Sequence, residues 1–590
     1  MGSLMIETFR RIKVQRGLRH ILGLTCICCA LANAGCGSVT PSLSSSNAAP
    51  RVDWGMSLLS GGTVSAGQFP AKFSFDVNAP PDCTNDFVVF NTALLGSAGS
   101  SANIVAFNNL YSTQGSRGGL CNQDGPSVYW SYFTGVGRTR TSVALSLDGS
   151  KVAFVEDGGF GTAVLNILKW KAGEGSGAAS PAAVDLDISG SPWTACTPGV
   201  SCIATVSFSG TAMDSLSAPF VDYANDVIYV GDNKGSLHKF TGVFNGTPAE
   251  VTTGWPIMVN PTHALSSPVY DSGSRNIFVG DAAGRLSYVR DTSSTVGSCG
   301  SGSPPCLGAM TQQVGTAGAI ADGPILDSTS GFVFAVNGTD TSNHGTILQA
   351  NTSLTSQVQF SIGGTGARGT GTLYGGAFDQ AYLNSSPGNI AGFMYVCGKD
   401  PAHTNRPAIY QLDFSPAGVL ISVGTPLLMN STTDGAACSP VTEINNTGSS
   451  FASGEWIFFS IGGFAANAAP IPTTSNCRSG VSLNGNQGCL MGINLTNASN
   501  PAINPGGTWP PVNAFFVAQG ANNNANAVAL LQNNAGSSSG IIVDNVSASP
   551  QTSSIYFSVP NTGGTGPGLP NCNTATGVGC AVKLTQSNLN

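Results

Sequence analysis

Short apolar runs separated by turn-forming residues recur along most of the chain. Each unit begins with a short apolar strand that ends in an acidic residue. A longer apolar strand, a glycine-containing turn and a third strand follow. The clearest copies cover residues 217–240 and 267–289. Their apolar positions are rich in Val, Ile, Phe and Tyr, which pleated, half-buried surfaces favour. The pattern therefore predicts an all-β protein built from a repeated unit.

Weaker copies of the unit extend the series in both directions and bring the total to eight. Each copy contributes one acidic residue after its first strand, where a carboxylate accepts hydrogen bonds from turn amides. One acid per copy suits this turn-capping role better than a calcium site, which gathers several oxygens at short spacing. The predicted turn-capping residues are Asp76, Asp148, Asp222, Asp271, Asp327, Asp379, Glu443 and Asp544.

Eight units of three or four strands predict a single β-propeller over residues 69–590. We expect eight blades, with seven as the alternative, made of mostly four-stranded antiparallel sheets. A closed ring explains how so much β-structure avoids exposed edges. A β-helix would need shorter and more regular coils than these units, and a string of separate sandwich domains is the other rival.

The best copies of the unit resemble a known family. The pattern Ser-Pro-apolar-apolar-Asp, followed by Tyr-Val-Gly-Asp-x-x-Gly-x-Leu, is similar to the blade repeat of the quinoprotein-like (PQQ-like) β-propellers. Residues 145–155 resemble WD40- and TolB-type blades. The likeness spans about residues 70–590, is strongest over 217–349, and implies a fold rather than an activity. The quinoprotein enzymes have a disulfide between adjacent cysteines and a Trp-bearing docking repeat. Neither has a counterpart in the predicted mature chain, so we expect no PQQ and no other cofactor.

The N-terminus has the pattern of an export signal. Five Arg and Lys residues between positions 10 and 19 precede an apolar stretch at 21–34. The stretch is short for a membrane-spanning helix and indicates a signal peptide over residues 1–35. Two processing routes stay open: ordinary cleavage after Ala32-Asn33-Ala34, or a lipobox that makes Cys36 a lipidated N-terminus. The segment 36–68, which starts Ser- and Pro-rich, is predicted to be a flexible tether.

The cysteines agree with export. Twelve lie beyond Cys36, and an even number in an exported chain indicates disulfides. Their spacing suggests pairing between neighbours along the chain, although the connectivity stays open. The gaps between the cysteines are too long for a zinc knuckle, and histidines are too few to complete zinc sites. The twelve are Cys83, Cys121, Cys196, Cys202, Cys299, Cys306, Cys397, Cys438, Cys477, Cys489, Cys572 and Cys580.

Composition changes the picture in two ways. Only 9% of the residues are charged and 77 are glycine, which suits tight turns between strands rather than long surface helices. The formal net charge is −7 and no basic stripe is present, so a nucleic-acid partner is not expected. We expect a monomer that meets a membrane only through an N-terminal lipid.

No sequence motif predicts a catalytic site. The catalytic candidates would be His238, His263, His344 and His403. His238 falls in the third strand of its unit, where a surface or blade-packing position is expected, and His344 and His403 fall in loops. The string at 364–369 matches a dinucleotide fingerprint, but no helix follows to bind a pyrophosphate. The string at 536–540 matches a hydrolase elbow, but it lacks the strand before and the helix after. The aromatic run 129–133 and Trp509 could stack on sugars, although packing between blades explains them better.

The sequence therefore predicts an exported, extracytoplasmic protein, either an outer-membrane lipoprotein or secreted. We expect a noncatalytic binding or surface scaffold for an unknown protein or glycan. The long insertions at 156–210, 397–438 and 461–540 are the expected contact regions. The alternative is an exported propeller enzyme, such as a polysaccharide lyase, a glycosidase or a quinoprotein-type dehydrogenase. A glycosidase needs two facing carboxylates, and the sequence does not single out a pair.

Overall fold

The structure is a computed structural model in which the chain divides into two units, residues 1–48 and 49–590. Only parts of the second unit are described. The described ranges are 50–62, 67–74, 80–115, 118–159, 161–292, 298–300, 302–315, 318–338, 344–363, 372–401, 407–428, 438–446, 454–464, 487–495, 531–532, 538–545, 551–559 and 578–586. The predicted signal peptide and Cys36 lie outside them.

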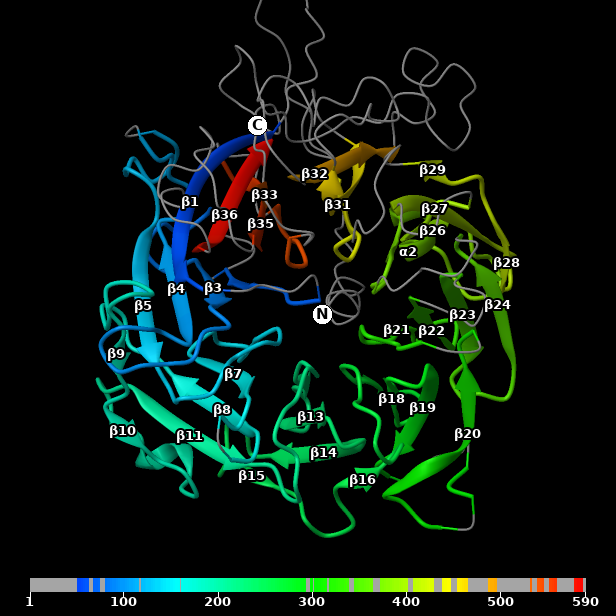
Figure 1. The fold of residues 1–590 in the computed structure, drawn as a ribbon, viewed down its shortest axis with the longest axis horizontal. Coiled ribbons are helices and arrows are strands. Elements are labelled where there is room, and N and C mark those ends of the chain that lie inside the picture. Colours follow the sequence, from blue (N-terminus) through cyan, green and yellow to red (C-terminus); the bar gives the residue numbers. More distant parts are fainter. Residues whose placement is uncertain are drawn as a thin grey trace, which may run out of the picture. The chain divides into compact units, whose positions relative to one another are not determined.

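The second unit contains eight small sheets in a ring, so the protein is an eight-bladed β-propeller (Figure 1). Blade 1 has β2 (Ala71–Phe73), β3 (Phe87–Asn91), β4 (Ile104–Asn108), β5 (Ser127–Phe133) and β9 (Ala182–Ala183). Blade 2 has β6 (Ala144–Leu145), β7 (Lys151–Glu156), β8 (Val164–Lys169), β10 (Leu186–Asp187) and β11 (Cys202–Ser207). Blade 3 has β12 (Phe220–Asp222), β13 (Val227–Gly231), β14 (Ser236–Thr241), β15 (Ala249–Glu250) and β16 (Ile257–Met258). Blade 4 has β17 (Val269–Asp271), β18 (Asn276–Gly280), β19 (Arg285–Arg290) and β20 (Cys306–Gln313).

The second half of the ring repeats this arrangement. Blade 5 has β21 (Ile325–Asp327), β22 (Phe332–Asn337), β23 (Thr346–Asn351) and β24 (Gln357–Ser361). Blade 6 has β25 (Ala377–Phe378), β26 (Phe393–Lys399), β27 (Pro407–Phe414), β28 (Leu420–Val423) and β29 (Leu427–Leu428). Blade 7 has β30 (Thr442–Asn446), β31 (Gly454–Phe464), β32 (Gln487–Asn494) and β33 (Leu531–Gln532). Blade 8 has β34 (Ile542–Asn545), β35 (Ser553–Val559), β36 (Val578–Gln586) and β1 (Pro50–Ser60). The short helices η1 (Trp193–Ala195) and α2 (Gln380–Leu383) lie in connections.

The ring closes through a strand from the opposite end of the chain. β1 pairs antiparallel with β36, from Pro50 opposite Gln586 to Ser60 opposite Val578. Blade 8 therefore combines three strands from the C-terminal region with one from the N-terminal region. The β-structure begins at Pro50, inside the segment 36–68 that the sequence analysis assigned to a tether. Residues 50–60 contain no copy of the repeat, because this strand completes a unit whose other strands lie more than 480 residues away.

Part of the insertion at 156–210 covers the outside of two blades. Within it, β9 pairs in parallel with β5 at the edge of blade 1, and β10 pairs in parallel with β11 at the edge of blade 2. These two short strands satisfy part of the hydrogen-bonding capacity of edges that would otherwise be open. Figure 1 shows both at the periphery of the ring. This part of the insertion protects edges.

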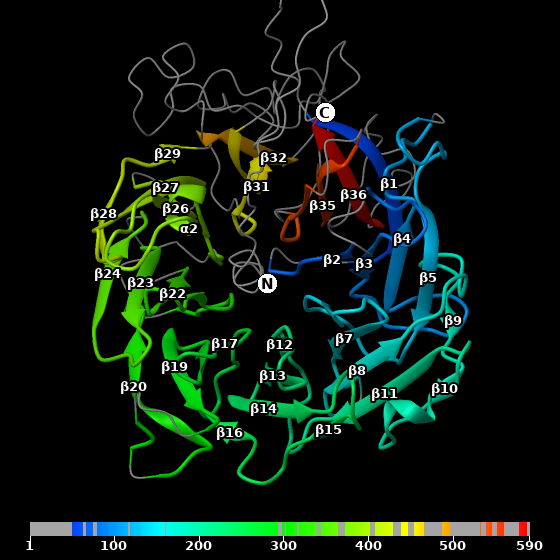
Figure 2. The same ribbon diagram turned by 180° about the vertical axis from the view of Figure 1, so that it is seen from behind.

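The core consists of apolar layers between neighbouring blades. For example, Val155 and Leu165 of blade 2 pack in one cluster with Ile228 and Val230 of blade 3. The second strands β3, β13 and β18 are buried at every position. In Figure 2, β12 and β17 lie towards the middle of the ring, while β15 and β20 lie at its periphery. The neighbouring blades cover both faces of each second strand, which explains why these strands are continuous runs of apolar residues.

Four of the eight repeated acids cap the turns after the first strands. Asp222, Asp271 and Asp327 each accept hydrogen bonds from backbone amides two and three residues further on, and Asp148 accepts one from Ser150 N at 3.0 Å. Asp379 instead caps α2, accepting from Tyr382 N at 2.8 Å. Asp76 lies outside the described residues.

The turn-capping prediction is wrong for Glu443 and Asp544. Both lie inside a strand, β30 and β34 respectively, rather than beyond its end. Asp544 is buried and forms an ion pair with Lys72 at 3.1 Å. Glu443 faces another carboxylate, as described below. In both cases the first strand extends past the acid, so the side chain points into the interface between blades.

Four of the neighbour pairings form disulfides: Cys83–Cys121, Cys196–Cys202, Cys299–Cys306 and Cys397–Cys438. Cys580 is also disulfide-bonded. Cys477, Cys572 and the side chain of Cys489 lie outside the described residues. The Cys397–Cys438 bridge joins blade 6 to the segment that enters blade 7. Among the described residues, no helix combines the length and apolar character needed to cross a membrane.

Candidate binding surface

Serine side chains organise the entries to several blades. Ser217, Ser266, Ser439 and Ser539 each lie just before a first strand, and their hydroxyls accept a hydrogen bond from a backbone amide in or after the second strand, at 2.8–2.9 Å. Ser538 is fully buried and donates to Ser460 Oγ at 2.7 Å. The Ser538–Gly540 part of the Gly-Ser-Ser-Ser-Gly string thus serves the blade 7–8 junction. Residues 536 and 537 lie outside the described residues.

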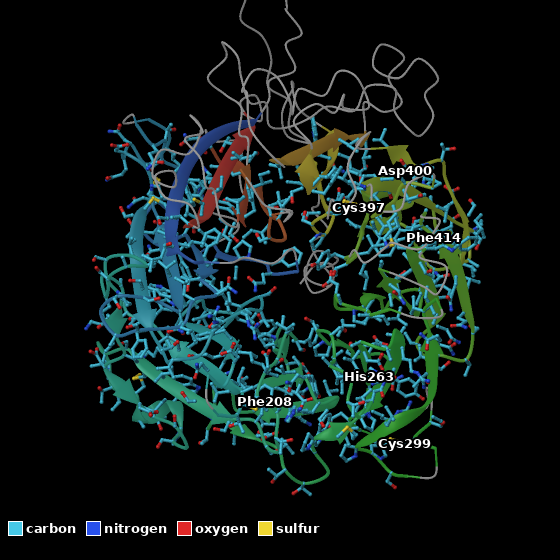
Figure 3. The ribbon with its side chains drawn as sticks, viewed as in Figure 1. Phe208, His263, Cys299, Cys397, Asp400 and Phe414 are labelled. Atoms are coloured by element: carbon cyan, nitrogen blue, oxygen red, sulfur yellow. A yellow bond between two sulfur atoms is a disulfide. The ribbon has the colours of Figure 1, made fainter. Side chains whose placement is uncertain are left out.

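His238 is held between two carboxylates inside blade 3. Its Nδ1 lies 2.6 Å from Glu250 Oε1 and its Nε2 lies 3.0 Å from Asp232 Oδ2. The imidazole is fully buried, and Phe208, labelled in Figure 3, packs against it at a ring-centroid distance of 4.6 Å. Burial opposes the charged ring, but the hydrogen bonds to Asp232 and Glu250 outweigh it and raise the pKa of His238. This arrangement gives His238 the packing role expected from the sequence.

The other histidines are not assembled with it. His263 lies in the connection between β16 and β17, where its Nδ1 is 3.2 Å from Pro261 O. His344 is half-buried just before β23. His403 and the string at 364–369 lie outside the described residues. Among the described residues, no group of three or more His, Cys, Asp and Glu side chains could hold a metal ion.

An acidic pair lies between blades 6 and 7. Glu443 pairs with Ile457 across β30 and β31, which places it diagonally opposite Glu455 on the same sheet face. Burial, followed by the charge of Glu455, raises the pKa of Glu443 to about 9. Asp379 is a third carboxyl group nearby, and burial raises its pKa to about 6. With a pKa of about 9, Glu443 is protonated at neutral pH, so these groups form a partly buried, proton-dependent contact between blades.

The surface that stands out lies on one end of the blades. In an antiparallel blade, the loop from second to third strand and the connection to the next blade emerge at the same end. We call this end the loop face. Four large apolar side chains are exposed in its loops over blades 1 to 3: Leu95, Val136, Met213 and Leu216, at 49%, 56%, 56% and 61%. We call these four residues the loop-face patch.

The loops that carry the patch are bonded to one another. Gly96 N donates to Gly137 O at 3.4 Å, and Gly158 N donates to Met213 O at 2.9 Å. Arg140 joins the same loops through ion pairs with Asp214 at 2.6 Å and Asp157 at 3.1 Å. The guanidinium charge is thereby neutralised locally. The patch therefore lies on a base of loops that are bonded to one another.

Glu156 supports this base from below. Its carboxylate accepts hydrogen bonds from Gly137 N at 2.8 Å and Asn166 Nδ2 at 2.7 Å. Burial raises its pKa to about 7. The side chain is buried beneath the β5–β6 loop, so its contacts hold Val136 in place.

The sequence analysis did not find this surface. Val136 lies before the insertion at 156–210, and Leu216 lies after it. The available signal was a pair of apolar residues, Met213 and Leu216, in a turn-rich stretch directly before the 217–240 unit, where the repeat has no inward position for them. The aromatic run 129–133 is largely core instead, because Trp130 and Tyr132 are fully buried. Trp509 lies outside the described residues.

The protein belongs to the class of eight-bladed β-propellers, and this statement rests on its strand pairing. No protein-family model matches the sequence, and no curated protein sequence matches it. Among solved structures, the chain is similar to BamB from Moraxella catarrhalis at 14% identity, covering 63% of this chain and 95% of that chain, with a TM-score of 0.29.

The chain is also similar to two other solved structures at comparable identity. The WD40 domain of Toxoplasma gondii coronin has 11% identity, with 75% of this chain and 84% of that chain covered and a TM-score of 0.34. Chaetomium thermophilum Sqt1, bound to the N-terminus of ribosomal protein L10, has 13% identity, 62% and 77% coverage and a TM-score of 0.36. Similarities at this level carry no argument about ligand or activity. The resemblance to PQQ-like propellers stays a prediction.

Proposed function

We propose that this protein is an exported β-propeller, lipid-anchored or secreted, that binds an apolar segment of a protein partner through the loop-face patch. The patch itself carries the proposal. Four large apolar side chains are exposed together on one end of three adjacent blades, whereas scattered single residues would need no explanation. Propellers commonly bind through the loops of one face, which a rigid ring positions.

The chemistry of the patch favours a protein over a glycan. Leu, Val and Met side chains bury area against apolar groups, while sugars are usually stacked on aromatic rings. Within the aromatic run 129–133, Trp130 and Tyr132 are buried in the blade and cannot serve that purpose, and Tyr129 and Phe133 are only partly exposed. Arg140 is paired with two carboxylates, so its charge is not available to a ligand. An uncharged, apolar segment is the partner that fits.

A matched pair of variants tests the binding surface. In the exported full-length protein, Met213→Glu with Leu216→Glu should reduce recovery of the partner at least about tenfold, since losing anchors worth more than about 1.4 kcal/mol has that effect. Met258→Glu with Ile421→Glu is the control, because these side chains are 48% and 54% exposed elsewhere on the ring. Equal recovery by the patch variant and wild type, at unchanged unfolding midpoint, contradicts the proposal.

Export is tested at the N-terminus. The basic segment followed by residues 21–34 and the disulfides support it. If Cys36 is lipidated, cells fed a radioactive fatty acid label the wild type and not Cys36→Ser. Absence of label, together with protein in the medium, indicates the secreted form. Protein found only in the cytoplasm with reduced cysteines sinks the export proposal.

A further inference from the structure

The closing strand pair buries a lysine against a carboxylate. Lys583 of β36 is fully buried, and its Nζ lies 2.8 Å from Asp53 Oδ2 of β1. Asp53 is 2% exposed and lies at a register shift between Val52 and Trp54, where β1 bulges opposite Lys583. The carboxylate also accepts hydrogen bonds from Thr585 and Gln551, while Lys583 Nζ donates to Gln551 O at 2.9 Å. The two reactive groups are thus fixed in contact.

The surroundings are apolar, and a second carboxylate is near. Trp54, Tyr111 and Tyr556 belong to the cluster that encloses the closing strands, and Lys583 Nζ lies 5.5 Å from the centre of the Tyr111 ring. The charge of Asp544 acts on Lys583, but burial dominates and lowers the pKa of the amine. Lys72 Nζ lies 3.1 Å from Asp544 Oδ2.

We propose that Lys583 and Asp53 react to form an intramolecular isopeptide bond that closes the ring covalently. A buried charge pair can become a neutral amine and a neutral acid by moving one proton along its hydrogen bond, and low polarity favours the neutral forms. Fixed contact between amine and carboxyl group supplies the proximity that amide formation otherwise lacks. The step joins existing groups of this chain and requires no oxidant, reductant or co-reactant.

The atoms balance in one condensation. The proton passes from Lys583 Nζ to Asp53 Oδ2, and the free amine lone pair attacks Asp53 Cγ. Asp544 accepts a proton from the nitrogen and returns it to the departing hydroxyl group. The C–O bond breaks, one water molecule leaves and an amide remains. Asp544 is the general acid and base of this step.

The consequence is a ring whose two ends cannot separate. β1 and β36 carry the closure, so an amide between them locks blade 8 independently of the disulfides. This inference concerns durability outside the cell and goes beyond the proposed binding function. The loop-face patch involves other blades, so either proposal can fail without the other.

The same chain contains a matched control pair. Lys239 Nζ lies 2.6 Å from Asp291 Oδ2, a contact as close as that of Lys583, but both side chains are partly exposed, at 16% and 13%. Contact alone would also predict cross-links at Lys239–Asp291 and Lys171–Glu174. Contact between two fully buried groups with a second carboxylate nearby favours Lys583–Asp53.

Peptide mapping of the purified, exported full-length protein decides the question. After reduction, alkylation and proteolysis, the peptides containing Asp53 and Lys583 should appear as one branched species, lighter than their sum by one water. Lys583→Met and Asp544→Ala should give only linear peptides, and Lys239→Met should keep the branched species. Linear, unmodified peptides from the wild type overturn the proposal and show that Lys583 and Asp53 form only an ion pair. That measurement needs no variant to fold.

Discussion

Replacing Lys583 with methionine should lower the free energy of unfolding by at least about 3–5 kcal/mol, whether the wild type holds Lys583 as an ion pair or as the proposed amide, since the variant leaves the buried Asp53 charge uncompensated. Asp53 is 2% exposed and lies 2.8 Å from Lys583, so in Lys583→Met its carboxylate loses its cation in a site that water does not reach. The pair also joins the first and last strands of the ring. The loss should appear in denaturant unfolding followed by circular dichroism.

The double variant Asp53→Asn with Lys583→Met provides the control. It removes both charges and keeps an amide that can bond to Thr585 and Gln551, so it should recover the stability that the uncompensated Asp53 charge costs. It should not recover any stability that a covalent bond to Lys583 supplies. Lys171→Met should leave the stability nearly unchanged, since the Lys171 side chain is 43% exposed and its ion pair with Glu174 is screened by water. A Lys583→Met protein as stable as the wild type would show that this contact does not close the ring.

Replacing Glu443 with glutamine should raise stability by about 3 kcal/mol at pH 7, because pH 7 lies 2.5 units above the unperturbed pKa of 4.5 and each unit corresponds to about 1.4 kcal/mol. The pKa of Glu443 is raised from 4.5 to about 9 by burial and by Glu455. The wild-type contribution is therefore fully present below about pH 4.5 and is lost as the pH rises towards 9. Glutamine supplies the neutral form at every pH, so the gain should grow from pH 5 to pH 9.

Unfolding midpoints of the wild type and Glu443→Gln, measured from pH 5 to pH 9, show whether the stability gain grows with pH as expected. Asp148→Asn is the comparison, because Asp148 is an exposed turn acid that has no facing carboxylate to protonate. Parallel pH curves for the wild type and Glu443→Gln would mean that Glu443 is ionised in the folded protein. A stability gain of Glu443→Gln that is confined to acidic pH would also mean that Glu443 is ionised in the folded protein.

The repeat could be predicted because its signals are local. The carboxylates of Asp222 and Asp271 accept hydrogen bonds from backbone amides two and three residues away. A few consecutive residues therefore determine each turn. Neighbouring cysteines such as Cys196 and Cys202 are likewise joined over a separation of 6 residues. Eight copies of a local signal then imply a closed ring, since open edges are disfavoured.

The closure and the patch depend on contacts that no local pattern contains. Asp53 and Lys583 are 530 positions apart, and only the pairing of β1 with β36 brings them together. Glu443 has the repeat position of a turn acid, but β30 continues past it and turns its side chain towards Glu455. Val136 and Leu216 enter one surface because loops from successive blades emerge at the same end. Sequence alone gives no distance between such loops.

The central claim, that this propeller presents its loop-face patch to a protein partner, is tested most directly by photo-crosslinking in the exporting cell. A photoreactive residue at Leu216 should give one specific adduct with a partner, and the same residue at Ile421, which is similarly exposed, should not. The Leu216 adduct should disappear when Met213→Glu is added. Adducts of equal yield from both positions, or none from Leu216, would contradict the claim.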